Sequence, residues 1–297
     1  MKLDHTFIAI RHRDILEICD LALRVIREHA LTLLSILVMI AAPLGVLDWW
    51  IVYGGSNNIA TSGDDLYPYW LMAVLVISQT QLATTPIARY LGRAMFEGRV
   101  SVRESLSIPR KTLAYFGWLY GVLRLGLPIV FFVWLARSSD EDGLLLISLL
   151  LLPGMLVVML ITNGVRPFVA EILVLEKTPI RKSTSGTICF AERSSALHVP
   201  ATGFLFGRHL LICGFAVLLH LLIYASFSWV NLILNVIDTV DSWFLPIIWS
   251  IALWLTTVFV AVVRFLSYID LRIRQEGWAV ELKLRAEGLR WQAAIGE

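Results

Sequence analysis

Long, uninterrupted runs of apolar residues dominate this chain, and six of them are long enough to be membrane-spanning helices. A bilayer core of about 30 Å requires roughly 20 apolar residues in an α-helix. The six runs cover residues 31–53, 67–88, 113–136, 143–163, 209–227 and 243–265. Each run is expected to be helical, because an open strand in lipid would leave its backbone N–H and C=O groups without partners. The pattern therefore predicts an all-α integral membrane protein with six transmembrane helices.

The composition supports this prediction. Of the 297 residues, 58% are hydrophobic and 16% are charged, and the mean hydropathy is +0.74. An average soluble domain is about half apolar and about a quarter charged, so an ordinary soluble globule is excluded. Disorder is excluded as well, because it requires low hydrophobicity. A net charge of +2 is too small to predict a nucleic-acid partner.

The basic residues alternate between the segments that connect the apolar runs. Segments 1–30, 89–112, 164–208 and 266–297 contain five, six, six and five Lys and Arg residues, whereas segments 54–66, 137–142 and 228–242 contain none, one and none. Cytoplasmic loops carry the excess of Lys and Arg. We therefore expect a multi-pass protein of the cytoplasmic (inner) membrane with both termini in the cytoplasm.

Amphipathic segments flank the predicted bundle. We divide the chain into a cytoplasmic N-terminal segment (1–30), a six-helix transmembrane domain (31–268) and a cytoplasmic tail (269–297). Residues 14–29 have apolar side chains on one side of a helix and charged ones on the other. This helix either lies on the inner leaflet or docks on the protein's own loops. The tail is also amphipathic, and either binds a partner or the membrane surface or packs on the cytoplasmic loops.

Capping signals predict two short helices in the cytoplasmic loops. Ser101 and Glu104 have the spacing of a capping box, which predicts a helix start at this point. Thr178 as N-cap and Pro179 at the first helical position predict a second helix over residues 180–190.

Polar residues at bilayer depth are the best candidates for a functional site, because they are costly to place there. Arg124 lies well inside the third run, and His220 lies at a similar depth in the fifth. Gln79 and Gln81 lie within the second. If these four converge, they form a donor-rich ligand site without a carboxylate, suited to an anion or a lipid phosphate. Asp48, near the end of the first run, is expected at the membrane interface.

The alternative for these four residues is structural. Arg124 would then extend its guanidinium to the inner surface, and His220, Gln79 and Gln81 would bond to neighbouring helices. Small residues also predict helix-packing faces. One such stripe ends at Gly92, and a second begins at Gly203 and Gly207.

No known catalytic or metal-binding motif occurs in the chain. It contains no Walker A, GxGxxG or HExxH motif, and no GxSxG motif with triad partners. The three cysteines, Cys19, Cys189 and Cys213, have neither a zinc-site spacing nor an even count, which predicts free thiols. We therefore expect no catalytic residues, no metal and no cofactor.

Three stretches carry a family resemblance. They are RDILEI at 13–18, RPFVAEILVLE at 166–176 followed by IRKS at 180–183, and YIDLRIRQEGW at 268–278. The chain resembles bacterial six-span proteins related to the membrane domain of some glycerophosphoryl diester phosphodiesterases. The resemblance implies the fold and topology. It does not imply hydrolysis, because the catalytic domain with its His-Arg-Gly run is absent.

Two functional hypotheses follow. The first is a non-enzymatic membrane component that assembles in the lipid bilayer with membrane or cytoplasmic proteins through its cytoplasmic helices. The second is a transporter or permease for a small or lipidic anion, with Arg124 and His220 in its ligand site.

Overall fold

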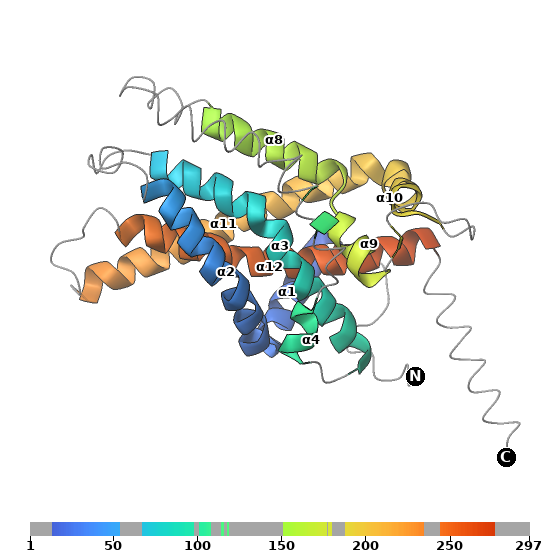
Figure 1. Ribbon diagram of the computed structural model, residues 1–297, viewed down its shortest axis with the longest axis horizontal. Coiled ribbons are helices and arrows are strands. Elements are labelled where there is room, and N and C mark those ends of the chain that lie inside the picture. Colours follow the sequence, from blue (N-terminus) through green and yellow to red (C-terminus); the bar gives the residue numbers. More distant parts are fainter. Residues whose placement is uncertain are drawn as a thin grey trace, which may run out of the picture.

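The computed structural model is helical throughout its regular structure (Figure 1). It describes residues 14–53, 67–97, 101–107, 114–115, 118, 151–176, 178–179, 188–234 and 244–276. The helices are α1 (Ile15–Glu28), α2 (Ala30–Tyr53), α3 (Tyr67–Glu97), α4 (Val102–Leu106), α8 (Leu152–Val165), α9 (Val169–Leu175), α10 (Phe190–His198), α11 (Thr202–Leu234) and α12 (Phe244–Glu276), with a short 3₁₀ turn, η4 (Val199–Ala201). The all-α class is confirmed for these residues.

Four helical stretches among the described residues are long and apolar enough to cross a membrane: Ala30–Tyr53, Pro68–Met95, Phe190–Val230 and Leu245–Gln275. A fifth is added if α8 and α9, which meet at 46°, form one bent span. The predicted runs 31–53 and 209–227 fall within two of these stretches, and the runs 67–88 and 243–265 overlap the other two except for their first one and two residues. Run 143–163 is described only from residue 151, and run 113–136 lies almost wholly outside the described residues.

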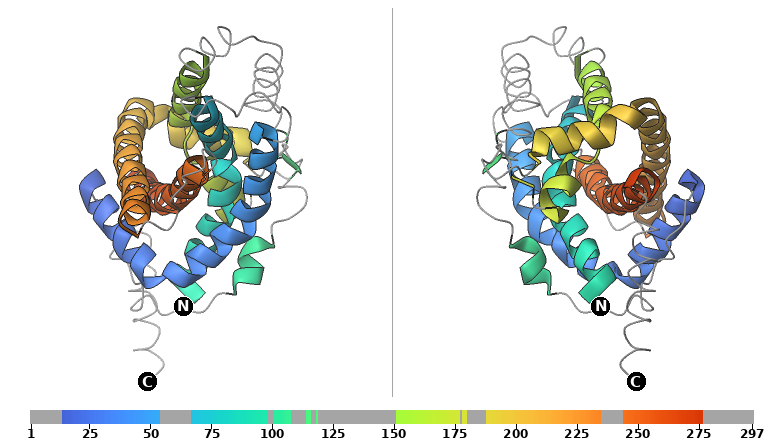
Figure 2. Two further views of the ribbon diagram at one scale, coloured as in Figure 1. Left: turned by 90° about the vertical axis from the view of Figure 1, so that its left-hand side faces the viewer. Right: turned by 90° about the vertical axis from the view of Figure 1, so that its right-hand side faces the viewer.

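Helices α3 and α12 form the centre of the molecule, and α2 and α11 lie on its flanks (Figure 2). The most apolar windows of α3 and α12 are 72% and 61% buried, whereas those of α2 and α11 are 17% and 11% buried. Apolar side chains of α3 and α12 pack together in the main core, among them Ile87, Val262 and Phe265. The flanking helices thus expose long apolar surfaces, as membrane helices do to lipid.

One end of the bundle is rich in charged residues, and we call it the charged end. His29, between α1 and α2, meets Tyr90 near the end of α3, with 3.1 Å between Nδ1 and Oη. Arg208, near the start of α11, pairs with Asp270, near the end of α12, at 2.8 Å. Helices α2 and α3 therefore run antiparallel, as do α11 and α12, and chain segments rich in basic residues meet at this end.

The opposite end is rich in aromatic residues, and we call it the aromatic end. Trp49 and Tyr53 stack at the end of α2, with ring centroids 4.1 Å apart. Tyr69 of α3 and Tyr224 of α11 both pack edge-on against Trp249 of α12, at 5.7 and 5.2 Å. Trp and Tyr rings favour the headgroup level of a bilayer, so this belt fits a second membrane surface.

Helix α1 docks on the chain itself, but not on the loops that one of the two predicted alternatives named. Its buried face, with Ile18 and Ala22, belongs to the main core, which also contains Phe265 of α12. Helix α1 contacts α12, a long helix of the bundle. Leu16 and Leu23 remain exposed, at 63% and 52%.

The predicted helix start at Ser101 is confirmed, because α4 begins at the next residue. The capping box is wrong, since the Ser101 side chain makes no capping hydrogen bond. Glu104 instead reaches across to Arg93 of α3, at 2.7 Å.

Most of the helix predicted over 180–190 lies outside the described residues. Pro179 is described and is not helical. Its carbonyl accepts a hydrogen bond from the backbone N–H of Phe190, the first residue of α10. The N–H of Cys189 donates to Glu192 at 3.3 Å, so the start of α10 is capped there.

The packing stripe that ends at Gly92 is confirmed. A Cβ atom on Gly92 would lie 2.5 Å from the Leu175 side chain, so glycine allows α9 to approach α3 closely. The second expected packing face has no such close neighbour among the described residues, where a Cβ atom on Gly203 or Gly207 would meet nothing within 4 Å.

Candidate functional site

Arg264 is a buried cation at the point where α3, α9 and α12 meet. It is only 4% exposed. Its guanidinium donates to Gln81 Oε1 of α3 at 2.8 Å and to Glu171 Oε2 of α9 at 3.1 Å. It also donates to the carbonyl oxygen of Pro167, which lies between α8 and α9. One arginine thus joins three parts of the chain that are far apart in sequence.

The break between α8 and α9 supplies part of this site. Pro167 has no backbone N–H, and a residue before proline disfavours helical backbone. Arg166 accordingly leaves the helix, with φ −136° and ψ 74°. The chain turns into α9, whose second and third residues, Ala170 and Glu171, are buried. A proline-induced break therefore provides both a free carbonyl and a buried carboxylate to Arg264.

A second cluster surrounds Glu176, at the end of α9. Arg193 of α10 donates two hydrogen bonds to its carboxylate, at 2.6 and 2.9 Å. Tyr268 of α12 donates a third, and Arg272 lies 3.7 Å away. Burial alone would raise the pKa of Glu176, but the hydrogen bonds from Arg193 and Tyr268 and the charges of Arg193 and Arg272 lower it below its ordinary value.

A third cluster joins α11 to α12. Asp270 accepts hydrogen bonds from Arg208 at 2.8 Å and from Arg274 at 3.0 Å. The side chains of Arg208 and Asp270 are 5% and 4% exposed, so this is a buried ion pair.

These three clusters form what we call the buried charge network. It consists of Glu171, Glu176, Asp270, Arg193, Arg208, Arg264, Arg272 and Arg274. Each of its three carboxylates pairs with at least one arginine, and the arginines outnumber the carboxylates by two. The network therefore ties α9, α10, α11 and α12 together at the charged end.

The four residues predicted as a ligand site have different surroundings. Arg124 lies outside the described residues. His220 of α11 is buried, and its ring packs edge-on against Trp249 at 4.3 Å. Gln81 accepts a hydrogen bond from Arg264, whereas Gln79 donates to Asp48 Oδ1 at 2.5 Å. The described contacts of His220, Gln79 and Gln81 thus lead to three different neighbours.

Carboxylates lie beside two of the polar residues that were predicted at bilayer depth. Asp48, near the end of α2, is 0% exposed and faces Gln79 of α3. Gln79 donates to this carboxylate directly, and Gln81 shares Arg264 with Glu171.

Arg264 and Glu171 do not stand out in the sequence as a site. Arg264 is next to the last residue of the sixth predicted run, where a basic residue fits the cytoplasmic flank. Glu171 falls in a segment interpreted as a loop. The signal for it is the sequence Val169–Leu175, in which a single acid interrupts an otherwise apolar heptamer. Two of the stretches that carry the family resemblance also meet here, through Glu176 and Tyr268.

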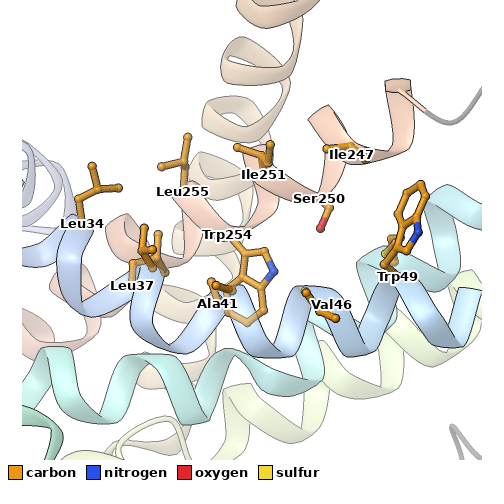
Figure 3. A pocket seen from close by; sticks show the side chains of 14 residues that line it. Leu34, Leu37, Ala41, Val46, Trp49, Ile247, Ser250, Ile251, Trp254 and Leu255 are labelled. Atoms are coloured by element: carbon orange, nitrogen blue, oxygen red, sulfur yellow. The ribbon is translucent and has the colours of Figure 1, made fainter. Parts of the chain in front are cut away.

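An apolar groove lies between α2 and α12, with a volume of about 550 Å³ (Figure 3). Its lining runs from Leu34 and Leu255 at one end to Trp49 and Ile247 at the other. Ser250 contributes the hydroxyl oxygen in this lining. The groove suits an apolar group, and its lining contains no charged residue.

No family model matches the chain, and no curated protein or solved structure matches it. Within the described ranges, no group of three or more His, Cys, Asp or Glu residues could hold a metal ion. Cys19, Cys189 and Cys213 are free thiols, as predicted. The structure therefore defines an all-α protein with several helices able to cross a membrane and a buried charge network at one end.

Proposed function

We propose that this chain is a non-enzymatic six-span protein of the cytoplasmic (inner) membrane, with both termini in the cytoplasm, that works as a component of a membrane complex. The buried charge network is the observation that supports this role. A general acid or base must exchange its proton with a reacting group. Glu171, Glu176 and Asp270 are instead engaged by arginines. Such carboxylates brace the charged end as a rigid platform.

Helix α1 provides the surface on which a partner would bind. One face is fixed on the bundle through Ile18 and Ala22. Leu16 and Leu23 lie seven residues apart, and therefore on one side of the helix, and both are exposed. A rigid helix that presents leucines among charged residues can contact a protein partner without first having to fold.

Photo-crosslinking tests this assembly. A photoreactive residue at Leu16 or Leu23 should give protein adducts of defined mass after mild detergent extraction. The same residue at buried Ala22 should give none. The proposal is contradicted if none of the three positions forms an adduct with a protein, or if adducts form with lipid alone.

Reporter fusions test the orientation. Fusions at Asp64 and Arg103 should report opposite compartments, with Arg103 in the cytoplasm, because segment 89–112 is rich in basic residues. If both positions report the same compartment, six spans with alternating loops are contradicted.

A transporter or permease for a small or lipidic anion is the second candidate. The broken α8–α9 pair favours it, because discontinuous helices line the substrate sites of many transporters. Arg124→Gln should then reduce uptake or lipid binding, whereas Arg103→Gln, on exposed α4, should not. Unchanged uptake by a normally folded Arg124→Gln variant would remove this candidate.

A further inference from the structure

Asp48 and Gln79 form an isolated polar pair between α2 and α3. Asp48 is 0% exposed. The Gln79 amide nitrogen donates to Asp48 Oδ1 at 2.5 Å. Among the described residues, the other oxygen of each side chain, Asp48 Oδ2 and Gln79 Oε1, is buried and has no hydrogen-bond partner. The pair therefore contains two unsatisfied acceptors, one on each side chain.

An ionised carboxylate is poorly supported in these surroundings. Burying an unpaired charge costs several kcal/mol. No cation of the described residues pairs with Asp48, and the arginines of the buried charge network lie at the other end of the bundle. The titratable groups near this end are Tyr53 of α2, Tyr69 of α3, and His220 and Tyr224 of α11. The two residues of α11 pack against Trp249 of α12. Residues 152–165 of α8 include no ionisable side chain.

A single proton satisfies both unsatisfied atoms. With a proton on Oδ2, the Asp48 hydroxyl donates to Gln79 Oε1 while the Gln79 amide donates to Asp48 Oδ1. The two side chains then form a reciprocal acid–amide pair in which each supplies one donor and one acceptor. The pair is neutral, as its buried position between two apolar helices requires.

We propose that Asp48 and Gln79 form a proton-binding site close to the aromatic end of the bundle, and that Asp48 carries the proton at neutral pH. Asp48 lies five residues before Tyr53, the last residue of α2, or about 7.5 Å along the helix. The proton comes from water at that surface and returns to it, with no change in oxidation state. This site is separate from the buried charge network, and the proposal does not depend on the function proposed above.

Infrared difference spectroscopy of the full-length protein in detergent tests the proposal directly. At neutral pH the wild type should show a protonated carboxylic acid C=O band that is absent from Asp48→Asn. Asp20→Asn, which alters an exposed carboxylate on α1, should retain the band. Gln79→Leu should shift the band to higher frequency, because the carbonyl loses its hydrogen bond. Identical spectra for wild type and Asp48→Asn would overturn the proposal. A band that appears only after sodium is removed would also overturn it, because the site would then hold a sodium ion in place of the proton.

Thermal unfolding gives an independent measurement. Asparagine reproduces the neutral acid, since its amide can donate to Gln79 Oε1 and accept from Gln79 Nε2. Asp48→Asn should therefore melt at least as high as the wild type at neutral pH. As the pH rises above about 4, where an unfolded aspartate ionises, the wild type should lose stability relative to Asp48→Asn, because the unfolded chain releases the proton that the folded chain retains. Strong destabilisation of Asp48→Asn at neutral pH, or the same pH dependence in both proteins, would overturn the proposal.

Discussion

The two ends of the bundle bury carboxylates in opposite ways. At the charged end, Glu171, Glu176 and Asp270 each lie against at least one arginine. At the aromatic end, the described surroundings of Asp48 offer an amide, Gln79, and no cation. Pairing with arginine keeps a carboxylate ionised, whereas an apolar site with an amide favours the neutral acid. The same chemical group therefore braces the structure at one end and can take up and release a proton at the other.

Asparagine substitutions at the two ends compare these roles directly, and should give the largest difference. Asp270→Asn leaves Arg208 buried without its counter-charge, which costs about 3–5 kcal/mol when one partner of a buried pair is removed. Asp48→Asn, which retains a neutral polar group, should cost less than about 1 kcal/mol. Chemical unfolding in detergent measures both. Equal losses for the two variants would contradict a neutral Asp48.

The Arg264–Glu171 pair tests whether the charged end depends on charge or on shape. Arg264→Met alone should cost about 3–5 kcal/mol, because it leaves Glu171 buried without a cation. The double variant Arg264→Met with Glu171→Leu should recover much of that loss, since apolar residues of similar volume can replace a buried pair. A double-mutant cycle on the free energy of unfolding is the measurement. Additive losses would exclude a coupled pair.

Acid should weaken the charged end through Glu176. The arginines and Tyr268 hold its pKa below the ordinary value of 4.5, so the folded state binds its proton less tightly than the unfolded state. The resulting stability is present above pH 4.5 and is lost as the pH falls toward the pKa in the folded state. Glu176→Gln should remove this part of the acid sensitivity and cost about 1.5–3 kcal/mol at neutral pH. Unchanged acid sensitivity in Glu176→Gln would contradict this assignment.

Close packing at the charged end predicts a smaller effect. Gly92→Ala places a methyl group 2.5 Å from Leu175, and overpacking of this kind costs about 1–3 kcal/mol. Gly203→Ala is the matched control, because its methyl group meets nothing of the described part of the chain within 4 Å. It should stabilise the helix by up to about 1 kcal/mol. Thermal unfolding of the two variants should therefore shift in opposite directions.

Much of the fold could be predicted from hydrophobic periodicity, and the deviations have physical causes. The run 31–53 matches α2, Ala30–Tyr53, to within a residue. Helix α12 continues to Glu276, beyond the predicted end at residue 265. Charged residues end an apolar run without ending a helix, and here Asp270 and Arg274 make contacts along the extension.

The polar contacts could not be predicted, because they depend on which helix faces meet. Gln79 and Gln81 are two residues apart, and therefore about 200° apart around a helix. They accordingly contact different neighbours, Asp48 and Arg264. The position of a residue along its helix can be predicted from the sequence. Its contact partner cannot, because that depends on which helix packs against its side of the helix.

Substitution in an exposed ion pair should cause the smallest loss of stability, and it is the reference for substitutions in the buried pairs. Arg93 and Glu104 are 2.7 Å apart, but their side chains are 34% and 56% exposed. Exposed pairs contribute about 0.2–1 kcal/mol and are weakened by salt. Glu104→Gln should therefore cost no more than about 1 kcal/mol at low salt, and less at high salt, whereas Asp270→Asn should remain costly in both. If the two variants respond to salt alike, Asp270 is exposed to water in solution. The contrast between the two ends then fails, because the charged end would not be held together by a buried ion pair.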